Sequence, residues 1–347
     1  MQKGIFFLLI AVFSIALSWY EPPAALMQEE LLVAEVLEQL GEAPLPHKPD
    51  TSLAGVSVAK GRDLVKRGSP GGPGGMVSPH FTCLACHNVE RDEPTLSFDN
   101  PQERLEYVAE KDLPFLPGTA LYGAVNRTRF YNGDYEKKYG DLVKNARHSL
   151  RESIQLCAIE CSQGRPLDAV EMESVLAYLW TIGLKIDDLA LDKTAQERIE
   201  AALAGQGDPE AAIRLIKSRY ATAAPATFVE PPKDRKEGYP VAEADAANGR
   251  LIYENSCLHC HENKRYAFFR LDKSRFSHRQ LKKHIPRYTR YSIYQVIRYG
   301  TSPVPGKRSY MPNYTMEKLT HQMVEDLRAY IELRAGGGTP GEKEKGI

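Results

Sequence analysis

The sequence predicts a mainly α-helical protein built from two tandem domains that repeat one unit. Three observations lead to this fold class. The pattern Cys-x-x-Cys-His occurs twice, at residues 83–87 and 257–261. A Gly-Arg pair that opens a short amphipathic segment precedes each copy, at Gly61 and Gly249, and an apolar stretch with helical spacing follows each copy, around Tyr178 and Tyr330. A duplicated unit of helix, motif, loop and closing helix accounts for all three.

This repeat places the two domains at residues 56–190 and 245–336. Between them, residues 194–204 and 209–220 are expected to be helices, with Asp208 as an N-cap and Pro209 at the first helical position. The chain then becomes rich in Pro and Ala up to residue 245, so the segment 191–244 is predicted to be a helical and Pro/Ala-rich linker.

The two ends of the chain differ from the repeated unit. A charged residue, Lys3, precedes an apolar run over 5–17 and then small residues, which is typical of a signal peptide over 1–20. The run is short for a membrane span, which needs about 20 apolar residues, although an uncleaved N-terminal anchor is the alternative. Residues 21–55 are expected to form an extension with a helix over 28–40, which either packs across a domain or acts as a juxtamembrane spacer. Residues 337–347 are expected to be a disordered tail.

The spacing of each Cys-x-x-Cys-His motif is the attachment signature of c-type haem. In this interpretation Cys83 and Cys86 bind one porphyrin, Cys257 and Cys260 bind a second, and His87 and His261 are the proximal iron ligands. A zinc knuckle or a redox dithiol would explain a single Cys-x-x-Cys. Two copies, each with an immediate His, in a chain with six cysteines favour two covalently attached haem c groups. Because such haem is attached after export, the motifs agree with the leader in predicting a periplasmic protein.

The order of helix, haem motif, loop, ligand and closing helix resembles class I cytochromes c, twice over. Met311, in a Tyr-Met-Pro sequence just before the second closing helix, resembles the distal methionine ligand of that family. Met316 and Met323 are rivals, but Met323 falls within the predicted helix and is expected in the core. A thioether ligand favours Fe(II) and therefore a higher potential.

The first domain has no methionine in the corresponding position. Met311 stands nineteen residues before Tyr330, and the residue nineteen before Tyr178 is Ile159, which lies between Cys157 and Cys161. These are the two cysteines outside the haem motifs. A Cys157–Cys161 disulfide, natural in an oxidising compartment, a thiolate on iron, and a bis-His haem with His148 are the open alternatives.

Residues 147–157, followed by Ser162-Gln163-Gly164-Arg165-Pro166-Leu167 and Glu171-Met172, resemble the first domain of thiosulfate dehydrogenases and their SoxA relatives. The resemblance covers about residues 60–185. It implies that Cys157 is the axial ligand of a catalytic haem that oxidises thiosulfate. The chain departs from the family at Cys161, where serine is usual, and at Ser162-Gln163, where Met-Asn is usual.

Thiosulfate is a dianion, so a catalytic site for it needs cations. Arg127, Arg147 and Arg165 are the catalytic candidates beside Cys157, because arginine presents a forked and always charged donor. The alternative for each is that it binds a haem propionate or lies on the solvated surface.

The stretch from Lys264 to Arg298 has eleven Lys or Arg residues and one acid, Asp272, interleaved with aromatic residues. Export argues against nucleic acid as a partner. We expect a docking face for an acidic redox protein, either a cytochrome or a membrane electron-transfer complex; the alternative is a solvated face whose aromatic residues line the haem. His259, inside the second motif, is expected to be an exposed spacer.

Together these features predict a dihaem cytochrome in which electrons enter at the first haem and leave through the second. It is unsettled from the sequence whether the protein is an enzyme. If it is one, it resembles a thiosulfate dehydrogenase. The alternatives are a pure electron carrier with a Cys157–Cys161 disulfide and a dihaem peroxidase.

Overall fold

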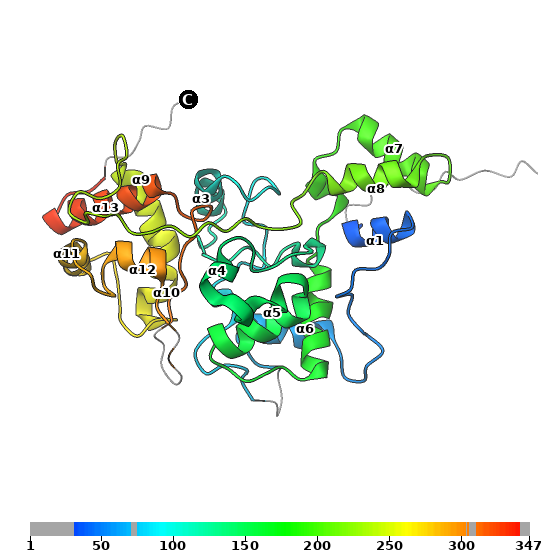
Figure 1. Cartoon of the computed structure of the whole chain (residues 1–347), viewed down its shortest axis with the longest axis horizontal. Coiled ribbons are helices and arrows are strands. Elements are labelled where there is room, and N and C mark those ends of the chain that lie inside the picture. The colour runs from blue at the N-terminus through cyan, green and yellow to red at the C-terminus, as the bar shows by residue number, and fades with distance from the viewer. Residues whose placement is uncertain (1–30, 71–74, 303, 305–309, 341–347) are drawn as a thin grey trace, which may run out of the picture.

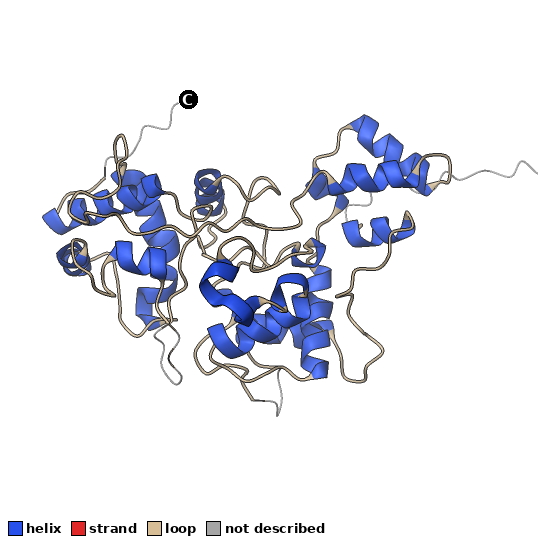
Figure 2. Ribbon diagram, viewed as in Figure 1, coloured by secondary structure: helices blue, strands red, loops and turns tan. Residues whose placement is uncertain are grey.

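The computed structural model describes residues 31–70, 75–302, 304 and 310–340. The predicted leader over 1–20 and the last seven residues of the predicted tail lie outside the described residues. Within these residues the chain is helical and forms no strand, as predicted, with two isolated β-bridges that pair Leu32 with Lys185 and Thr301 with Met311 (Figure 2). None of the described helices combines the length and the apolar composition that a bilayer span requires.

The first unit is organised by the crossing of α2 (Val58–Arg67) and α6 (Ala169–Thr181). Gly61 makes this crossing possible, since a Cβ atom there would lie 1.8 Å from the carbonyl oxygen of Ser174. Helix α6 begins with a capping box between Asp168 and Glu171, and its core-facing side is apolar. The predicted opening and closing helices are therefore packed directly on each other.

The second unit repeats this crossing with α9 (Ala246–Ile252) and α13 (His321–Gly336). A Cβ atom on Gly249 would lie 1.9 Å from the carbonyl oxygen of Asp326. Ser174 and Asp326 each precede the shared tyrosine, Tyr178 or Tyr330, by four residues. The internal repeat is therefore structural as well as sequential, and a glycine at the same place brings the two backbones together in both units.

The remaining helices of the two units are α3 (Pro101–Glu110), α4 (Tyr135–Tyr139), α5 (Leu150–Leu156), α10 (Leu258–His261), α11 (Arg275–His284) and α12 (Ile293–Tyr299). Helix α3 belongs to the first unit in sequence but packs on the second. Its residues Leu105 and Val108, with Phe115 just beyond, are fully buried in the core formed by α9, α12 and α13. The core of the second unit thus includes apolar residues of the first unit, whose own core is a separate cluster around α2 and α6. Figure 1 shows α3 between the two units.

A third apolar cluster lies at the end of the molecule away from the second unit (Figure 1). It is built by α1 (Val33–Gln39), α7 (Lys193–Leu203) and α8 (Pro209–Lys217). The side chain of Asp208 accepts hydrogen bonds from the amides of Glu210 and Ala211, as expected for the N-cap of α8. The N-terminal extension therefore packs against the linker helices, which is a third arrangement besides the two expected for it.

Candidate haem sites

His87, the histidine of the first motif, is partly buried and is oriented by a backbone carbonyl. Its Nδ1 lies 2.8 Å from the carbonyl oxygen of Thr119. A carbonyl oxygen only accepts, so Nδ1 carries the proton and Nε2 is left with a free lone pair. Burial lowers the pKa of His87, which keeps the imidazole neutral at neutral pH. This is the state in which histidine binds a metal.

Gly118 fixes the position of this histidine. Its amide donates to the carbonyl oxygen of Cys86 at 2.9 Å. A Cβ atom on Gly118 would lie 2.5 Å from Cε1 and Nδ1 of the His87 ring. Position 118 must therefore be glycine for the His87 ring to reach the carbonyl oxygen of Thr119.

The second motif has the same arrangement on a more helical backbone. It runs through a π-helical turn, Tyr253–Cys257, into α10. His261 Nδ1 lies 3.3 Å from the carbonyl oxygen of Phe269, and the two rings are in contact with centroids 4.4 Å apart. Burial lowers the pKa of His261. Each motif thus presents a neutral imidazole whose Nε2 has no hydrogen-bond partner in the described part of the chain.

The cysteine thiols of both motifs form no disulfide, since all six cysteines of the chain are free in this structure. Burial raises the pKa of Cys83 to about 11 and the pKa of both Cys257 and Cys260 to about 12. Two free thiols and an oriented imidazole at each motif fit a covalently attached porphyrin.

Met311 lies on the loop before α13, as expected. Its backbone is fixed by Thr301, whose amide donates to the Met311 carbonyl oxygen at 2.8 Å and whose hydroxyl accepts from the Met311 amide at 2.7 Å. The Met311 side chain packs against the core of the second unit. Of its two rivals, Met323 is 1% exposed and belongs to the core on α13, as predicted. Met316 follows beyond the loop, where its amide donates to Thr227.

A buried arginine braces the loop that carries Met311. Arg298 on α12 donates through Nη1 to the carbonyl oxygen of Leu319 at 2.8 Å and through Nε to the hydroxyl of Tyr239 at 3.0 Å. Among the residues that the structure describes, its Nη2 is buried without a hydrogen-bond partner, as are Nδ2 of Asn313 and Oγ1 of Thr315. Buried polar atoms seldom stay unpaired, and these suit the polar groups of a porphyrin held beside this loop.

Cys157 and Cys161 begin and end a π-helical turn that extends α5. Burial and the neighbouring Cys260 and Cys161 raise the pKa of Cys86, which places Cys161 close to the first motif. Cys161 interacts with Cys157 and with the hydroxyls of Tyr131 and Tyr310. Ile159 between the two cysteines is 39% exposed and His148 lies on the surface. Cys161, rather than these residues, therefore lies near Cys86, and Cys157 lies beside Cys161.

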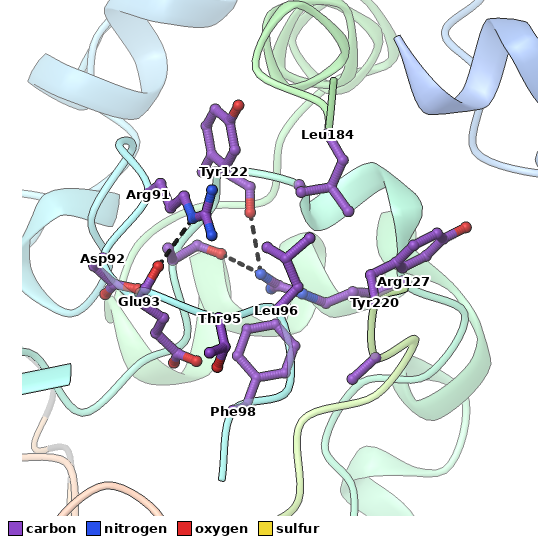
Figure 3. Close-up of a pocket in the computed structure, with 13 residues that line it drawn as sticks. Arg91, Asp92, Glu93, Thr95, Leu96, Phe98, Tyr122, Arg127, Leu184 and Tyr220 are labelled. Atoms are coloured by element: carbon purple, nitrogen blue, oxygen red, sulfur yellow. Dashed lines mark hydrogen bonds between the residues drawn. The ribbon is translucent and has the colours of Figure 1, made fainter. Parts of the chain in front are cut away.

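The three candidate arginines are each committed to a different protein partner. Arg127 is buried and donates through Nη2 to the carbonyl oxygens of Ala120 at 2.7 Å and Tyr122 at 3.2 Å (Figure 3). Arg165 forms a two-pronged ion pair with Glu171, and Arg147 pairs with Glu136. Among the residues that the structure describes, no contact joins any two of these arginines. The structure does not gather them into a cationic cluster.

A buried charged cluster beside the first motif has no counterpart among the sequence predictions. Arg104 on α3 donates to Asp92 at 2.6 Å and lies 3.6 Å from Glu93, which also binds Lys318 of the second unit at 3.2 Å. All four side chains are less than one-tenth exposed. Isolated charges in a charged sequence give no periodic signal, so sequence patterns could not have identified this cluster.

His259 is half-buried instead of exposed, so that expectation was wrong. Its Nε2 lies 3.0 Å from the carbonyl oxygen of Leu84 in the first motif, and its ring lies 5.7 Å from Tyr266. The expectation failed because it treated the motif in isolation, whereas the first motif covers this face of the second.

Residues 244–331 match the family model of cytochrome c oxidase, cbb3-type, subunit III. The second unit is a c-type cytochrome domain. It therefore belongs to a class of domain that holds haem c covalently and transfers electrons. Comparison with curated proteins and with solved structures found no match to the chain.

Proposed function

We propose that the chain is an exported, periplasmic dihaem c-type cytochrome whose first haem site oxidises thiosulfate or a related sulfur anion. The observation that carries the proposal is the structural equivalence of the two units. The first unit has the glycine-mediated helix crossing, the carbonyl-oriented histidine and the free cysteine pair of the cytochrome domain. The same local chemistry supports the same cofactor, for which one unit alone has the family match.

In this proposal Cys83, Cys86 and His87 hold one haem, and Cys257, Cys260, His261 and Met311 hold the other. Haem supplies one-electron redox chemistry at each site. Two thiosulfate ions joined by a new S–S bond release two electrons and no protons. Ferric haem at each of the two sites would accept one of these electrons, for transfer to an external redox protein.

Cys157 is proposed as the distal ligand of the first iron. A thiolate stabilises Fe(III) and lowers the potential, whereas the Met311 thioether raises it. Electrons would therefore run downhill from the first site to the second. The hydroxyls of Tyr131 and Tyr310 beside Cys161 supply hydrogen-bond donors near the sulfur atoms.

An acidic redox protein is the proposed electron acceptor. The basic stretch of the second unit presents exposed aromatic residues, with Phe276 79% and Tyr288 77% exposed. Their exposure favours a docking face over the alternative that these two rings line the haem. Aromatic residues among positive charges are typical of a surface that combines electrostatic steering with apolar contact.

A second candidate function is electron transfer without catalysis. The positions of the arginines favour it, because Arg127 and Arg165 are bound to carbonyls or to Glu171 instead of facing a substrate. In that case the first haem is a relay, and Cys157 and Cys161 are joined by a disulfide in the oxidised protein.

The haem count tests the cofactor proposal. Protein matured in a periplasmic expression host should give two haems per chain by the pyridine haemochrome assay. The double variant Cys83→Ser/Cys86→Ser and the double variant Cys257→Ser/Cys260→Ser should each give one. One haem in the unsubstituted chain would contradict the proposal.

The catalytic part is tested with Cys157→Ala and its matched control Cys161→Ala. Low-spin ferric haem with a thiolate EPR signature should be present in the unsubstituted protein and in the control, and should disappear in Cys157→Ala together with haem reduction by thiosulfate. An unchanged EPR spectrum in Cys157→Ala would exclude this residue as the ligand. If thiosulfate reduces no haem in the unsubstituted protein, the electron-transfer function is retained and the substrate is wrong.

A further inference from the structure

The two attachment motifs touch each other across the boundary between the units. His259 Nε2, in the second motif, lies 3.0 Å from the carbonyl oxygen of Leu84 in the first. Beside it, Cys260 Sγ lies 3.8 Å from the carbonyl oxygen of Ala85. The hydroxyls of Thr82 and Tyr266 lie 3.3 Å apart and close the same contact. Each of these residues is inside a motif or within six residues of one.

This contact joins the two turns that carry the cysteines of the attachment motifs. The Cys260 thiol reaches the carbonyl oxygen of Ala85, the residue directly before Cys86. In c-type haem the cysteine sulfur bonds directly to the edge of the porphyrin. Porphyrins attached at both motifs would therefore be held by turns that contact each other directly.

Within the motif contact, the His259 ring forms a hydrogen bond to the backbone of the first motif. The acceptor is a carbonyl, so Nε2 must carry the proton and donate. Burial lowers the pKa of His259, and the neutral ring suffices for this bond. The ring packs against Tyr266, which limits its rotation.

We propose that His259 is a positioning residue that holds the two motifs in register for direct electron transfer between them. This inference rests on the proposed function, because it requires haem at both motifs. One electron leaves the ferrous iron bound by His87 and reduces the ferric iron bound by His261. No bond is made or broken and no proton moves in this step.

Other contacts keep the units together when the His259 bond is removed. The amide of Phe115 donates to the carbonyl oxygen of Asn255 at 2.9 Å, and the side-chain amides of Gln102 and Asn248 exchange two hydrogen bonds of 3.0 Å. A cleft of about 840 Å³ lined by both motifs lies beside the contact. Loss of the His259 bond therefore loosens the motif contact next to solvent without separating the units.

The test compares His259→Leu with His259→Gln in the mature dihaem protein. Leucine removes the donor, whereas the glutamine amide can still donate to the Leu84 carbonyl. After flash photoreduction, electron equilibration between the haems is followed at the red-end band of the Met-ligated ferric haem. We expect His259→Leu to slow equilibration by about fivefold, the effect of losing one hydrogen bond on the population in contact. His259→Gln should stay close to the unsubstituted protein.

Two further readouts separate positioning from a general structural defect. The midpoint potentials of both haems should be unchanged in both variants, while magnetic coupling between the ferric haems in EPR should weaken in His259→Leu alone. Unchanged equilibration and coupling in His259→Leu would overturn this inference. A single haem per unsubstituted chain would instead overturn the proposed function, so the two failures are distinguishable.

Discussion

Glu93 of the first unit and Lys318 of the second form a buried ion pair, with Lys318 Nζ 3.2 Å from Glu93 Oε1. The two residues are separated by 225 positions in the chain. Arg104 lies on the other side of Glu93, at 3.6 Å, and binds Asp92. Burial, with Arg104 nearby, lowers the pKa of Lys318 to about 8. The cluster holds two acidic and two basic side chains. Because three of them belong to the first unit and Lys318 belongs to the second, the buried charges are balanced only when the two units are packed together.

Removal of one partner of this pair should therefore be costly. Glu93→Gln leaves the Lys318 ammonium buried with a weaker partner, and we expect a loss of about 3 kcal/mol in the free energy of unfolding, as for other broken buried pairs. Denaturant titration at neutral pH measures it. The double variant Glu93→Gln/Lys318→Met should recover most of the loss. A double variant as unstable as Glu93→Gln would show that the two residues are not energetically coupled.

The acid stability of the protein should depend on Asp92. Burial works to raise the pKa of Asp92, but Arg104 and Lys318 outweigh it and hold the pKa below its ordinary value. Because the folded-state pKa is the lower one, this carboxylate stabilises the fold above pH of about 4, its unfolded value, and the contribution disappears as the pH falls through the folded pKa.

The variant Asp92→Asn should be less stable than the parent at pH 7 and should lose less stability on acidification. Thermal unfolding followed by circular dichroism between neutral pH and pH of about 2 measures both curves. Parallel curves would contradict the role of Asp92.

The glycine at each helix crossing should tolerate no side chain. Gly249→Ala places a methyl group against the backbone of Asp326, and we expect a loss of about 3 kcal/mol, at the upper end for overpacking. Gly336→Ala is the matched control, since a Cβ atom there meets nothing within 4 Å at the end of α13. Urea titration of both variants provides the comparison. Equal stability of the two would mean that the crossing is not as tight as the structure has it.

The distal ligand of the second haem should be Met311. Met311→Leu conserves the apolar volume but removes the thioether, so the red-end absorption band of Met-ligated ferric haem should disappear and the midpoint potential should fall. Met316→Leu, five residues further on, should retain both properties. Optical redox titration distinguishes them, and loss of the band in Met316→Leu alone would transfer the assignment to that residue.

The helical parts of the fold were well predicted from local patterns. The opening and closing helices of both units, the cap at Asp208 and the burial of Met323 all follow from spacing that acts over one or two helical turns. The position of α3 was not predictable, because the apolar residues Leu105 and Val108 fit a core without specifying which one. For the same reason the sequence could not place Arg127 against backbone carbonyls instead of a substrate.

The sequence by itself determined which segments are helical, and it predicts where haem is attached. These features depend on residues that are neighbours in the chain: two cysteines and a histidine within five positions, or apolar side chains one turn apart. Only the tertiary structure decided that the two motifs meet at Leu84 and His259 and that Glu93 neutralises Lys318. Such pairings arise when distant segments pack together and exclude water, and no local spacing encodes which buried donor will face which acceptor.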